Sequence, residues 1–406
     1  MKFRFEDPPS DAAFRQELRA WLRSTLPKGW VEAIERQDEP AFQKARRDWD
    51  WFEFLAELGE AGYAAPTWPE EYGGLGATPR AERVIGEELA AMRLPVVSPN
   101  ILGLGIAGPT IIAHGTEAQK GRYLPAILRS REIWCQLFSE PGAGSDLANV
   151  ATRAVAEGGE FVVSGQKSWT SLADVARWGM LLARTDPDAP KHAGLTWFIL
   201  DMAGPSIEVR PLRQMTGEAE FNEVFLDRVR VPADNVVGGV GNGWEVAKTT
   251  LLNERVALSG AAFGGAEPQA ALLQAAHQEL DPALRDEVVQ RYIEAEVKAA
   301  TSARATARRL TGAPVGPEGS IGKLYNAELN QRTTVTALRL HKALALVRDD
   351  RYPEVAEAVR AFLRARANTI EGGTSEILRN VIGERVLGLP REPRVDLDKP
   401  WRDLSG

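Results

Sequence analysis

The amino-acid sequence predicts an α+β protein in which a β domain lies between two helical domains. Apolar residues recur at helical spacing up to about residue 130, follow the pattern of strands from about 133, and return to helical spacing after the glycine-rich stretch 238–243. We therefore expect an N-terminal helical domain over residues 1–132, a middle β-barrel-like domain over 133–237 and a C-terminal helical bundle over 238–406.

The composition is that of an ordinary globular protein. The 406 residues are 44% hydrophobic and 26% charged, which disfavours disorder and fibrous repeats. A net charge of −7 argues against a dedicated nucleic-acid surface, because phosphate binding needs a basic one. The single cysteine, Cys135, excludes an internal disulfide. No apolar run is long enough for a membrane span, and the first residues lack a signal core, so we expect a cytoplasmic protein without membrane contact.

The predicted N-terminal helices show clear apolar faces. Phe14, Leu18, Trp21 and Leu22 recur at helical spacing within Asp11–Leu22. The remaining helical patterns in this part of the chain are those around Trp51–Leu58, Arg80–Met92 and Ala118–Arg129.

Seven runs in the middle of the chain alternate or cluster as strands do. The second and third are joined across Gly158-Gly159, which predicts a tight hairpin. The runs are Trp134–Phe138, Thr152–Ala156, Phe161–Ser164, Trp178–Ala183, Leu195–Asp201, Ile207–Pro211 and Asn222–Val231.

Three helical segments are prominent in the last part of the chain. The first is Trp244–Ser259, and the second carries one apolar stripe made of Leu284, Val288, Val289, Tyr292, Ile293 and Val297. The last begins at Thr374 or Ser375, which suit an N-cap, and is expected to end at Leu389-Pro390. Its apolar face is Leu378, Val381, Ile382, Val386 and Leu389.

General motifs give little. Gly103-Leu104-Gly105-Ile106-Ala107-Gly108 matches a dinucleotide-binding pattern, but no convincing strand precedes it and no acidic residue follows about twenty residues on, which favours glycines that pack helices. The four histidines lack the spacing of metal ligands.

Two loops are chemically unusual. In Phe138–Asp146 a strand ends in small residues with exposed amides, so a flat or phosphorylated ligand could approach the main chain, although a plain turn is an equal alternative. In Gly165–Ser171 an indole and hydroxyl groups leave a strand end together, which suits a planar heterocycle with polar edges.

The chain resembles the acyl-CoA dehydrogenase family along nearly all of its length. Ser139-Glu140-Pro141-Gly142-Ala143-Gly144-Ser145-Asp146 is similar to the family's first flavin signature, and Gly165-Gln166-Lys167-Ser168-Trp169 to the strand whose Trp covers the flavin. The stretches His114–Lys120, Tyr123–Pro125 and Gly372–Ile377 are similar to further family signatures.

The resemblance implies an FAD enzyme that oxidises an acyl-CoA thioester to its trans-2-enoyl form, as in fatty acid β-oxidation. Electrons would pass to an electron-transfer flavoprotein, or to oxygen in an acyl-CoA oxidase. The isoalloxazine would lie between the β domain and the C-terminal helices. The residues implied to hold FAD are Gln136, Phe138, Ser139, Gly144, Ser145, Trp169, Ser171, Thr374 and Glu376, and those implied to contact the substrate are Ser145, Arg255 and Gly372.

Two carboxylates compete for the role of catalytic base, which removes the α-proton of the thioester. Glu254 lies on a stripe with Ala247, Leu251 and Leu258, where a lone acid is costly unless it is paired or functional. Some branches of the family carry their base there, although an ion pair with Arg255 is the alternative. Glu371 precedes the Gly-Gly-Thr turn but is one residue before the position where many members carry the base.

The chain departs from the family where many members bind the FAD pyrophosphate across a subunit interface. The stretches 311–320 and 337–350 lack the family's Arg-x-x-Phe-Gly and Gln-x-x-Gly-Gly-x-Gly patterns. The resemblance implies a homotetramer or homodimer, and the departure also allows a hetero-oligomer, in which this chain would be a catalytic or a structural subunit. The sequence leaves the acyl group open.

Overall fold

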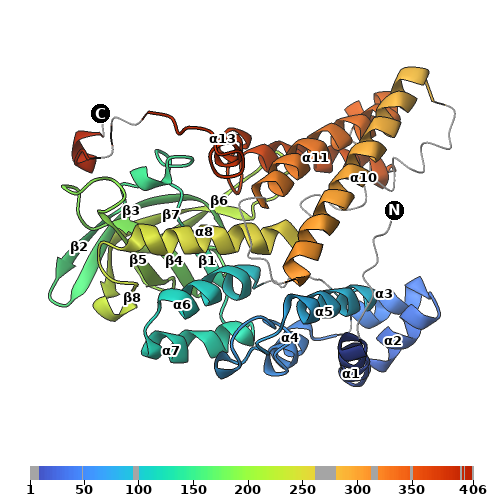
Figure 1. The fold of residues 1–406 in the computed structure, drawn as a ribbon, viewed down its shortest axis with the longest axis horizontal. Helices are drawn as coiled ribbons and strands as arrows, with labels where there is room; N and C mark the ends of the chain where they lie inside the picture. The colour runs from blue at the N-terminus through green and yellow to red at the C-terminus, as the bar shows by residue number, and fades with distance from the viewer. Residues whose placement is uncertain are drawn as a thin grey trace. The chain divides into compact units, whose positions relative to one another are not determined.

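The computed structural model describes residues 9–47, 49–94, 100–260, 280–311, 319–347, 351–393, 396 and 398–404, apart from the side chains of 256 and 258–260. The described chain divides into two compact units. The larger unit comprises the described parts of Phe5–Pro211, Phe221–Asn253 and Asp396–Gly406, and the smaller unit those of Leu212–Glu220 and Glu254–Val395. The α+β class and the order helices, sheet, helices agree with the sequence prediction (Figure 1).

Helices form the first part of the larger unit. They are α1 (Pro9–Thr25), α2 (Lys28–Glu35), α3 (Glu39–Arg47), α4 (Trp51–Glu60), α5 (Pro79–Ala91), α6 (Gly108–His114) and α7 (Glu117–Leu128). Their starts follow the expected capping chemistry: Asp50 and Thr78 accept backbone N–H bonds, and Thr116 forms a capping box with Gln119. The helical spacing seen in the sequence buries Leu18 and Leu22 of α1 in one core with Trp30 and Phe54.

A buried carboxylate joins the first and fifth helices. Glu88 of α5 is 2% exposed and accepts hydrogen bonds from Arg15 and Arg19 of α1 at 2.6 Å each. Two guanidinium groups therefore compensate the charge that burial would otherwise make costly.

The glycines of the dinucleotide-like motif pack helices, as expected. A π-helical turn over Gly103–Ala107 leads directly into α6. A Cβ on Gly108 would lie 2.0 Å from Cζ2 of Trp68, so this position needs a glycine for close packing.

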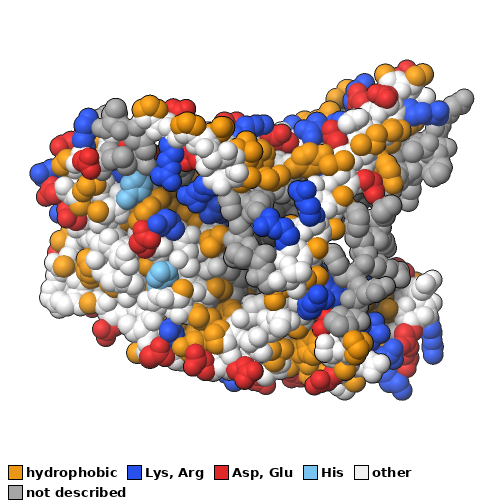
Figure 2. All heavy atoms as spheres, in the orientation of Figure 1, with side chains coloured by type: hydrophobic (Ala, Val, Ile, Leu, Met, Phe, Trp, Pro, Cys, Tyr) orange, Lys and Arg blue, Asp and Glu red, His pale blue; other side chains and the backbone are white. Residues whose placement is uncertain are grey.

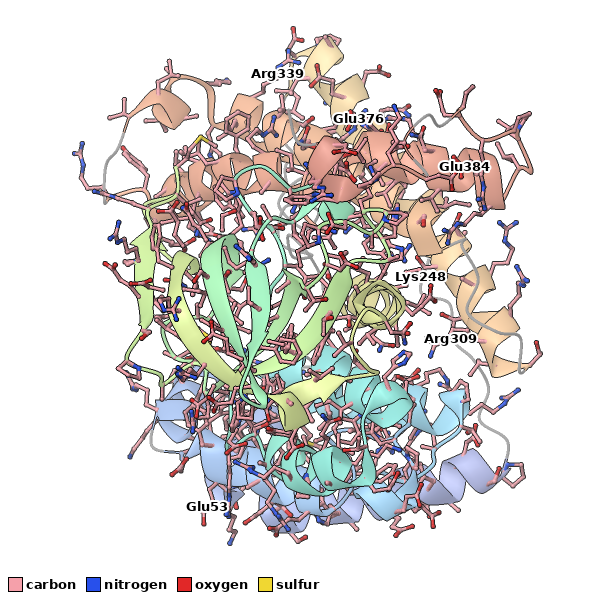
Figure 3. The ribbon with its side chains drawn as sticks, turned by 90° about the vertical axis from the view of Figure 1, so that its left-hand side faces the viewer. Glu53, Lys248, Arg309, Arg339, Glu376 and Glu384 are labelled. Carbon is pink, nitrogen blue, oxygen red and sulfur yellow. The ribbon has the colours of Figure 1, made fainter. Side chains whose placement is uncertain are left out.

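An eight-stranded sheet follows, and the N-terminal helices lie below it in both ribbon views (Figures 1 and 3). The strands are β1 (Trp134–Leu137), β2 (Arg153–Glu157), β3 (Glu160–Ser171), β4 (Trp178–Arg184), β5 (Leu195–Asp201), β6 (Ile207–Leu212), β7 (Phe221–Pro232) and β8 (Val236–Val237). Their order is β6-β7-β3-β2-β4-β5-β8, with β1 pairing parallel to β4. All seven predicted strands are present, and the β2–β3 hairpin turns at Gly158 and Gly159, whose φ angles are +61° and +88°.

One strand extends beyond its predicted end. β3 continues past Ser164 to Ser171 and pairs with β7, with register irregularities between Val163 and Gly165 and between Lys167 and Thr170. The second irregularity is a bulge-like feature that re-aims the side chains at the strand end.

The interior of the sheet includes the single thiol. Cys135 on β1 is 0% exposed and belongs to a core with Leu137, Leu181 and Phe198. Burial raises the pKa of Cys135 far above its ordinary value.

The α-helices that follow the sheet among the described residues are α8 (Gly243–Gly260), α10 (Pro282–Leu310), α11 (Gly319–His341), α12 (Pro353–Ala365) and α13 (Ser375–Arg385). In the smaller unit α11 contacts α10, α12 and α13. No helix among the described residues is long and apolar enough to cross a membrane.

The structure adds detail to one prediction for these helices and corrects another. The apolar stripe of α10 is only partly buried: Leu284 and Val288 are buried, but Val289, Tyr292, Ile293 and Val297 are between 43% and 52% exposed. Figure 2 shows hydrophobic side chains gathered over α10 and α11. α13 ends at Arg385 rather than at Leu389, which is exposed, because Gly388 adopts a φ of +69° that breaks the helix first.

Candidate active site

The segment after β1 forms a tight, open turn. Glu140 and Ala143 exchange backbone hydrogen bonds of 3.0 and 3.1 Å. A Cβ on Gly142 or Gly144 would meet nothing within 4 Å, so both glycines border open space. Ser145 is exposed at the end of this turn. The segment therefore offers backbone and hydroxyl groups to a ligand without side chains in the way.

The two predicted flavin segments lie together. The backbone N–H of Ser168 donates to the carbonyl of Ser139 at 2.9 Å, which joins the end of β1 to the end of β3. Phe138 is buried beside this bond, Ser139 is half-buried, and Gln136 is half-buried on β1, paired with Met180.

A buried ion pair underlies this junction. The ammonium of Lys167, 0% exposed, donates to the carboxylate of Glu140 at 2.7 Å and to the carbonyls of Phe138 and Leu182 at 3.0 and 2.8 Å. The same carboxylate accepts the backbone N–H groups of Ala151 and Thr152.

Burial and pairing act in opposite directions on these two groups. Burial lowers the pKa of Lys167 to about 8 despite its anionic partner. Burial alone would raise the pKa of Glu140, but the Lys167 charge and the hydrogen bonds outweigh it and the pKa lies below its ordinary value.

Trp169 presents an indole that the protein leaves uncovered. It adopts a φ of +57°, which is rare for a bulky residue, and its side chain is 63% exposed beside Phe221, with ring centroids 5.9 Å apart. The hydroxyls of Ser168 and Thr170 are buried without a hydrogen-bond partner in the described structure, and Ser171 is half-buried next to them. An exposed aromatic face beside unsatisfied hydroxyls fits a planar ring with polar edges, such as the isoalloxazine of FAD.

The end of the chain packs against the same β domain. Lys191 pairs with Asp146 at 3.0 Å and with Asp396 at 2.8 Å. Trp401 donates from Nε1 to Asn149 at 2.9 Å and stacks on the buried Arg184, whose guanidinium lies 4.4 Å from the ring centroid. These contacts bind the C-terminal segment next to the turn that carries Ser145.

Glu254 lies on α8 in the smaller unit, close to the turn before α13. A Cβ placed on Gly372 would be 3.9 Å from Oε1 of Glu254 and 3.7 Å from Cε of Lys323. Gly372 and Gly373 have φ angles of +60° and +94°, so only glycine adopts this turn without strain. On the predicted stripe Ala247 is buried and Leu251 half-buried, while the side chain of Leu258 lies outside the described ones.

Glu371 is bound by its neighbours. Arg364 of α12 donates to both of its carboxylate oxygens at 3.1 and 3.0 Å, and Asn368 donates to Oε1 at 2.8 Å. A fork of this kind is a strong, charge-assisted arrangement. It gives Glu371 the geometry of a structural ion pair that supports the turn.

The other predicted site residues of the smaller unit are Thr374 and Glu376, at the start of α13, and Arg255, next to Glu254 on α8. Thr374 caps α13 by accepting the N–H of Ile377 at 3.2 Å. Glu376 is exposed near the start of α13, and Figure 3 labels it together with Glu384 near the other end. Arg255 is half-buried next to Glu254, and burial together with the charge of Arg385 lowers its pKa.

Sequence reasoning missed five residues that shape these sites. Glu140 and Lys167 lie inside the two motifs discussed above. Their opposite charges at two strand ends could have predicted that they form an ion pair. Arg364, Asn368 and Lys323 carry no local signal, because their roles depend on which helices meet. Of the two stretches that lack the pyrophosphate patterns, residues 312–318 and 348–350 lie outside the described structure.

Comparison with known proteins gives the family. The models of the acyl-CoA dehydrogenase N-terminal, middle and C-terminal domains match residues 8–131, 135–229 and 241–387. Acyl-CoA dehydrogenase IpdE1 of Mycobacterium tuberculosis is 38% identical over 94% of this chain and 98% of its own length. Acyl-CoA dehydrogenase FadE34 of the same organism is 45% identical over 82% of this chain, which spans 46% of that longer protein.

Solved structures agree with this assignment. The Tcur3481-Tcur3483 steroid ACAD has a TM-score of 0.75 and 29% identity, covering 96% of this chain and all of that one. The ChsE4-ChsE5 complex from Mycobacterium tuberculosis has a TM-score of 0.73 and 27% identity over the same shares. The chain therefore belongs to the acyl-CoA dehydrogenase family, the FAD-dependent oxidoreductases that act on CH–CH bonds.

Proposed function

We propose that the protein oxidises an acyl-CoA thioester to the trans-2-enoyl-CoA, with Glu254 as the base that removes the α-proton. The position of Glu254 carries the proposal: its carboxylate borders the Gly372 turn, whereas Arg364 and Asn368 bind both oxygens of Glu371. Protonating Glu371 would weaken three hydrogen bonds that hold the turn, which makes it the poorer base.

Removal of the α-proton also needs a hydrogen-bond donor for the thioester carbonyl, which the backbone of the turn can provide. The α-proton of a thioester becomes acidic enough only if its carbonyl oxygen is hydrogen-bonded as enolate charge develops. We assign this role to the N–H of Gly372, a residue with a φ of +60° and no side chain to obstruct a ligand. Arg255, next to Glu254, is proposed to contact the CoA thioester.

The exposed indole of Trp169 and the hydroxyls around it are proposed to hold FAD. Phe138, Ser139, Gln136 and Ser171 would border its ring. Gly144 and Ser145 would let its phosphates or the CoA approach, and Thr374 and Glu376 would reach the adenosine part of an FAD. When bound, FAD supplies the acceptor for the hydride that leaves the β-carbon.

We further propose that the electrons pass to an electron-transfer flavoprotein and that the chain assembles with other subunits. We also propose that the chain has three domains, with the limits 1–132, 133–237 and 238–406 that the sequence predicts. Two solved relatives bear paired names, and one is called a steroid ACAD, which supports testing unlike subunits and a steroid-derived acyl group first. A homotetramer or homodimer is the alternative.

Flavin bleaching tests the base. The purified protein, with and without candidate partners, is mixed anaerobically with isobutyryl-CoA, octanoyl-CoA and a steroid side-chain CoA thioester. We expect Glu254→Gln to slow bleaching by about 10³-fold without loss of FAD. Glu371→Gln is the matched control and should slow bleaching far less. The reverse pattern would make Glu371 the base, and reoxidation by air as fast as by electron-transfer flavoprotein would indicate an oxidase.

A further inference from the structure

Lys323 of α11 holds both ends of the turn that contains Gly372. Its ammonium donates to the carbonyl of Asn368 at 2.9 Å and to the carbonyl of Gly373 at 2.7 Å. These two acceptors bracket the four residues between them, which include Glu371 and Gly372. One side chain therefore fixes the path of the whole turn.

The same side chain lies next to the proposed base. A Cβ on Gly372 would touch Cε of Lys323 at 3.7 Å and Oε1 of Glu254 at 3.9 Å, so Lys323 and Glu254 flank the same glycine. Burial lowers the pKa of Lys323, and the negative charges of Glu371 and Glu254 act against that shift.

The turn depends on such a support. Gly372 and Gly373 both have positive φ angles, and glycines have many alternative conformations of similar energy. Arg364 and Asn368 restrain the Glu371 side chain, whereas Lys323 binds the Gly373 carbonyl at the other end of the turn. Without that bond the Gly373–Thr374 peptide is free to rotate, and because two adjacent glycines precede it, the direction of the Gly372 N–H is then no longer fixed.

We propose that Lys323 is a positioning residue for the reaction: by holding the turn at Asn368 and Gly373, it aims the Gly372 N–H at the thioester carbonyl. The inference rests on the proposed function of Glu254. It requires no direct contact between Lys323 and the substrate.

The test measures how Lys323→Met and the unchanged protein bind and oxidise two ligands, only one of which has the thioester carbonyl oxygen. The ligands are the acyl-CoA that bleaches the flavin fastest and the S-alkyl-CoA thioether of the same carbon skeleton, which lacks the carbonyl. We expect Lys323→Met to lower kcat about 10²-fold, the cost of a misplaced hydrogen-bond donor. The affinity of Lys323→Met for the thioether should change less than twofold. The infrared C=O stretch of the thioester bound to this variant should move toward its value in water.

Matched variants separate positioning from folding. Lys298→Met removes another half-buried lysine of this unit, which bonds Asn326 on α11 instead of the turn, and should keep the kcat and the carbonyl stretch. Lys323→Arg keeps the charge and two donors and should recover most of the kcat. FAD content and circular dichroism confirm that each variant is folded.

The outcomes are distinguishable from those of the base assignment. If Glu254→Gln is inactive and Lys323→Met keeps its kcat and carbonyl stretch, only the positioning role is wrong. Equal losses of thioester and thioether binding in Lys323→Met would also overturn it, because that pattern means general damage. If Glu254→Gln stays active, or if no thioester bleaches the flavin, the proposed function fails and the role of Lys323 fails with it.

Discussion

Lys167 and Glu140 form an ion pair that is closed off from water, with 2.7 Å between Nζ and Oε1. The pair is also a structural hub, because it binds the carbonyls of Phe138 and Leu182 and the N–H groups of Ala151 and Thr152. Its removal would therefore affect β3 and β4, on which Lys167 and Leu182 lie, and both proposed flavin segments together.

Breaking this pair from one side should be more harmful than removing it whole. Lys167→Met leaves a buried carboxylate without its cation, and the free energy of unfolding should fall by about 3–5 kcal/mol. The Lys167→Met/Glu140→Leu double variant removes both charges and should recover part of that loss. Thermal unfolding of the three proteins measures both effects. A double variant less stable than Lys167→Met would contradict the reasoning.

The exposed indole of Trp169 should matter to the cofactor rather than to the fold. Because the side chain is 63% exposed, Trp169→Ala should change the stability of the FAD-free chain by less than about 0.5 kcal/mol. Loss of stacking should weaken FAD binding roughly tenfold and shift the visible flavin spectrum. Phe52→Ala, which removes an aromatic side chain that is 61% exposed on α4, is the control and should leave FAD affinity unchanged. Equal FAD dissociation constants for Trp169→Ala and the unchanged protein would refute the assignment.

Acid should destabilise the N-terminal helices through Glu88. Burial raises the pKa of Glu88, but hydrogen bonds and charges of Arg19 and Arg15 more than offset this, so the net pKa lies below its ordinary value of 4.5. The unfolded chain then binds the proton more readily, and the stabilisation is complete above about pH 4.5 and is lost as the pH falls through the folded pKa. Between pH 6 and 3 the melting temperature of the unchanged protein should fall more steeply than that of Glu88→Gln. Parallel curves would show that Glu88 contributes nothing to the acid sensitivity.

The C-terminal segment should stabilise the larger unit through Trp401. Trp401→Ala loses a cation–π contact with Arg184 and a hydrogen bond to Asn149, together about 2 kcal/mol. Trp401→Phe keeps an aromatic ring over Arg184 and loses only the hydrogen bond, so its cost should be about half as large. Denaturation curves and the rate of tryptic cleavage near Arg402 report the change. If Trp401→Phe is as damaging as Trp401→Ala, the stacking on Arg184 adds no stability.

The sequence predicted those parts of the fold that depend on local periodicity. The strand pattern and Gly158-Gly159 were enough for the β2–β3 hairpin, and the spacing of Leu18 and Leu22 was enough for the buried face of α1. Periodicity also located the apolar stripe of α10, but periodicity shows only that a face is apolar and not what covers it, and part of this stripe is exposed. The end of α13 was misplaced because the sequence pattern continues past the point where Gly388 turns the backbone.

The candidate site also contains residues that the local sequence suggested and residues that only the packing of helices reveals. Short segments with unusual chemistry suggested Ser139 and Trp169, the apolar stripe of its helix suggested Glu254, and the family resemblance suggested Gly372. The supports of the site come from distant parts of the chain: Arg364 and Lys323 reach the Gly372 turn from two different helices. Only the packing of those helices shows that Glu371 is held by Arg364.

The deeply buried thiol of Cys135 has a practical consequence for experiments on this protein. The native chain has no other cysteine, and this one is inaccessible and strongly disfavoured as a thiolate. A cysteine introduced at an exposed position would thus be the single site of maleimide attachment without a cysteine-free background. Two introduced cysteines, one in each unit, could carry a pair of fluorophores or spin labels that reports the distance between the units in solution while the enzyme turns over.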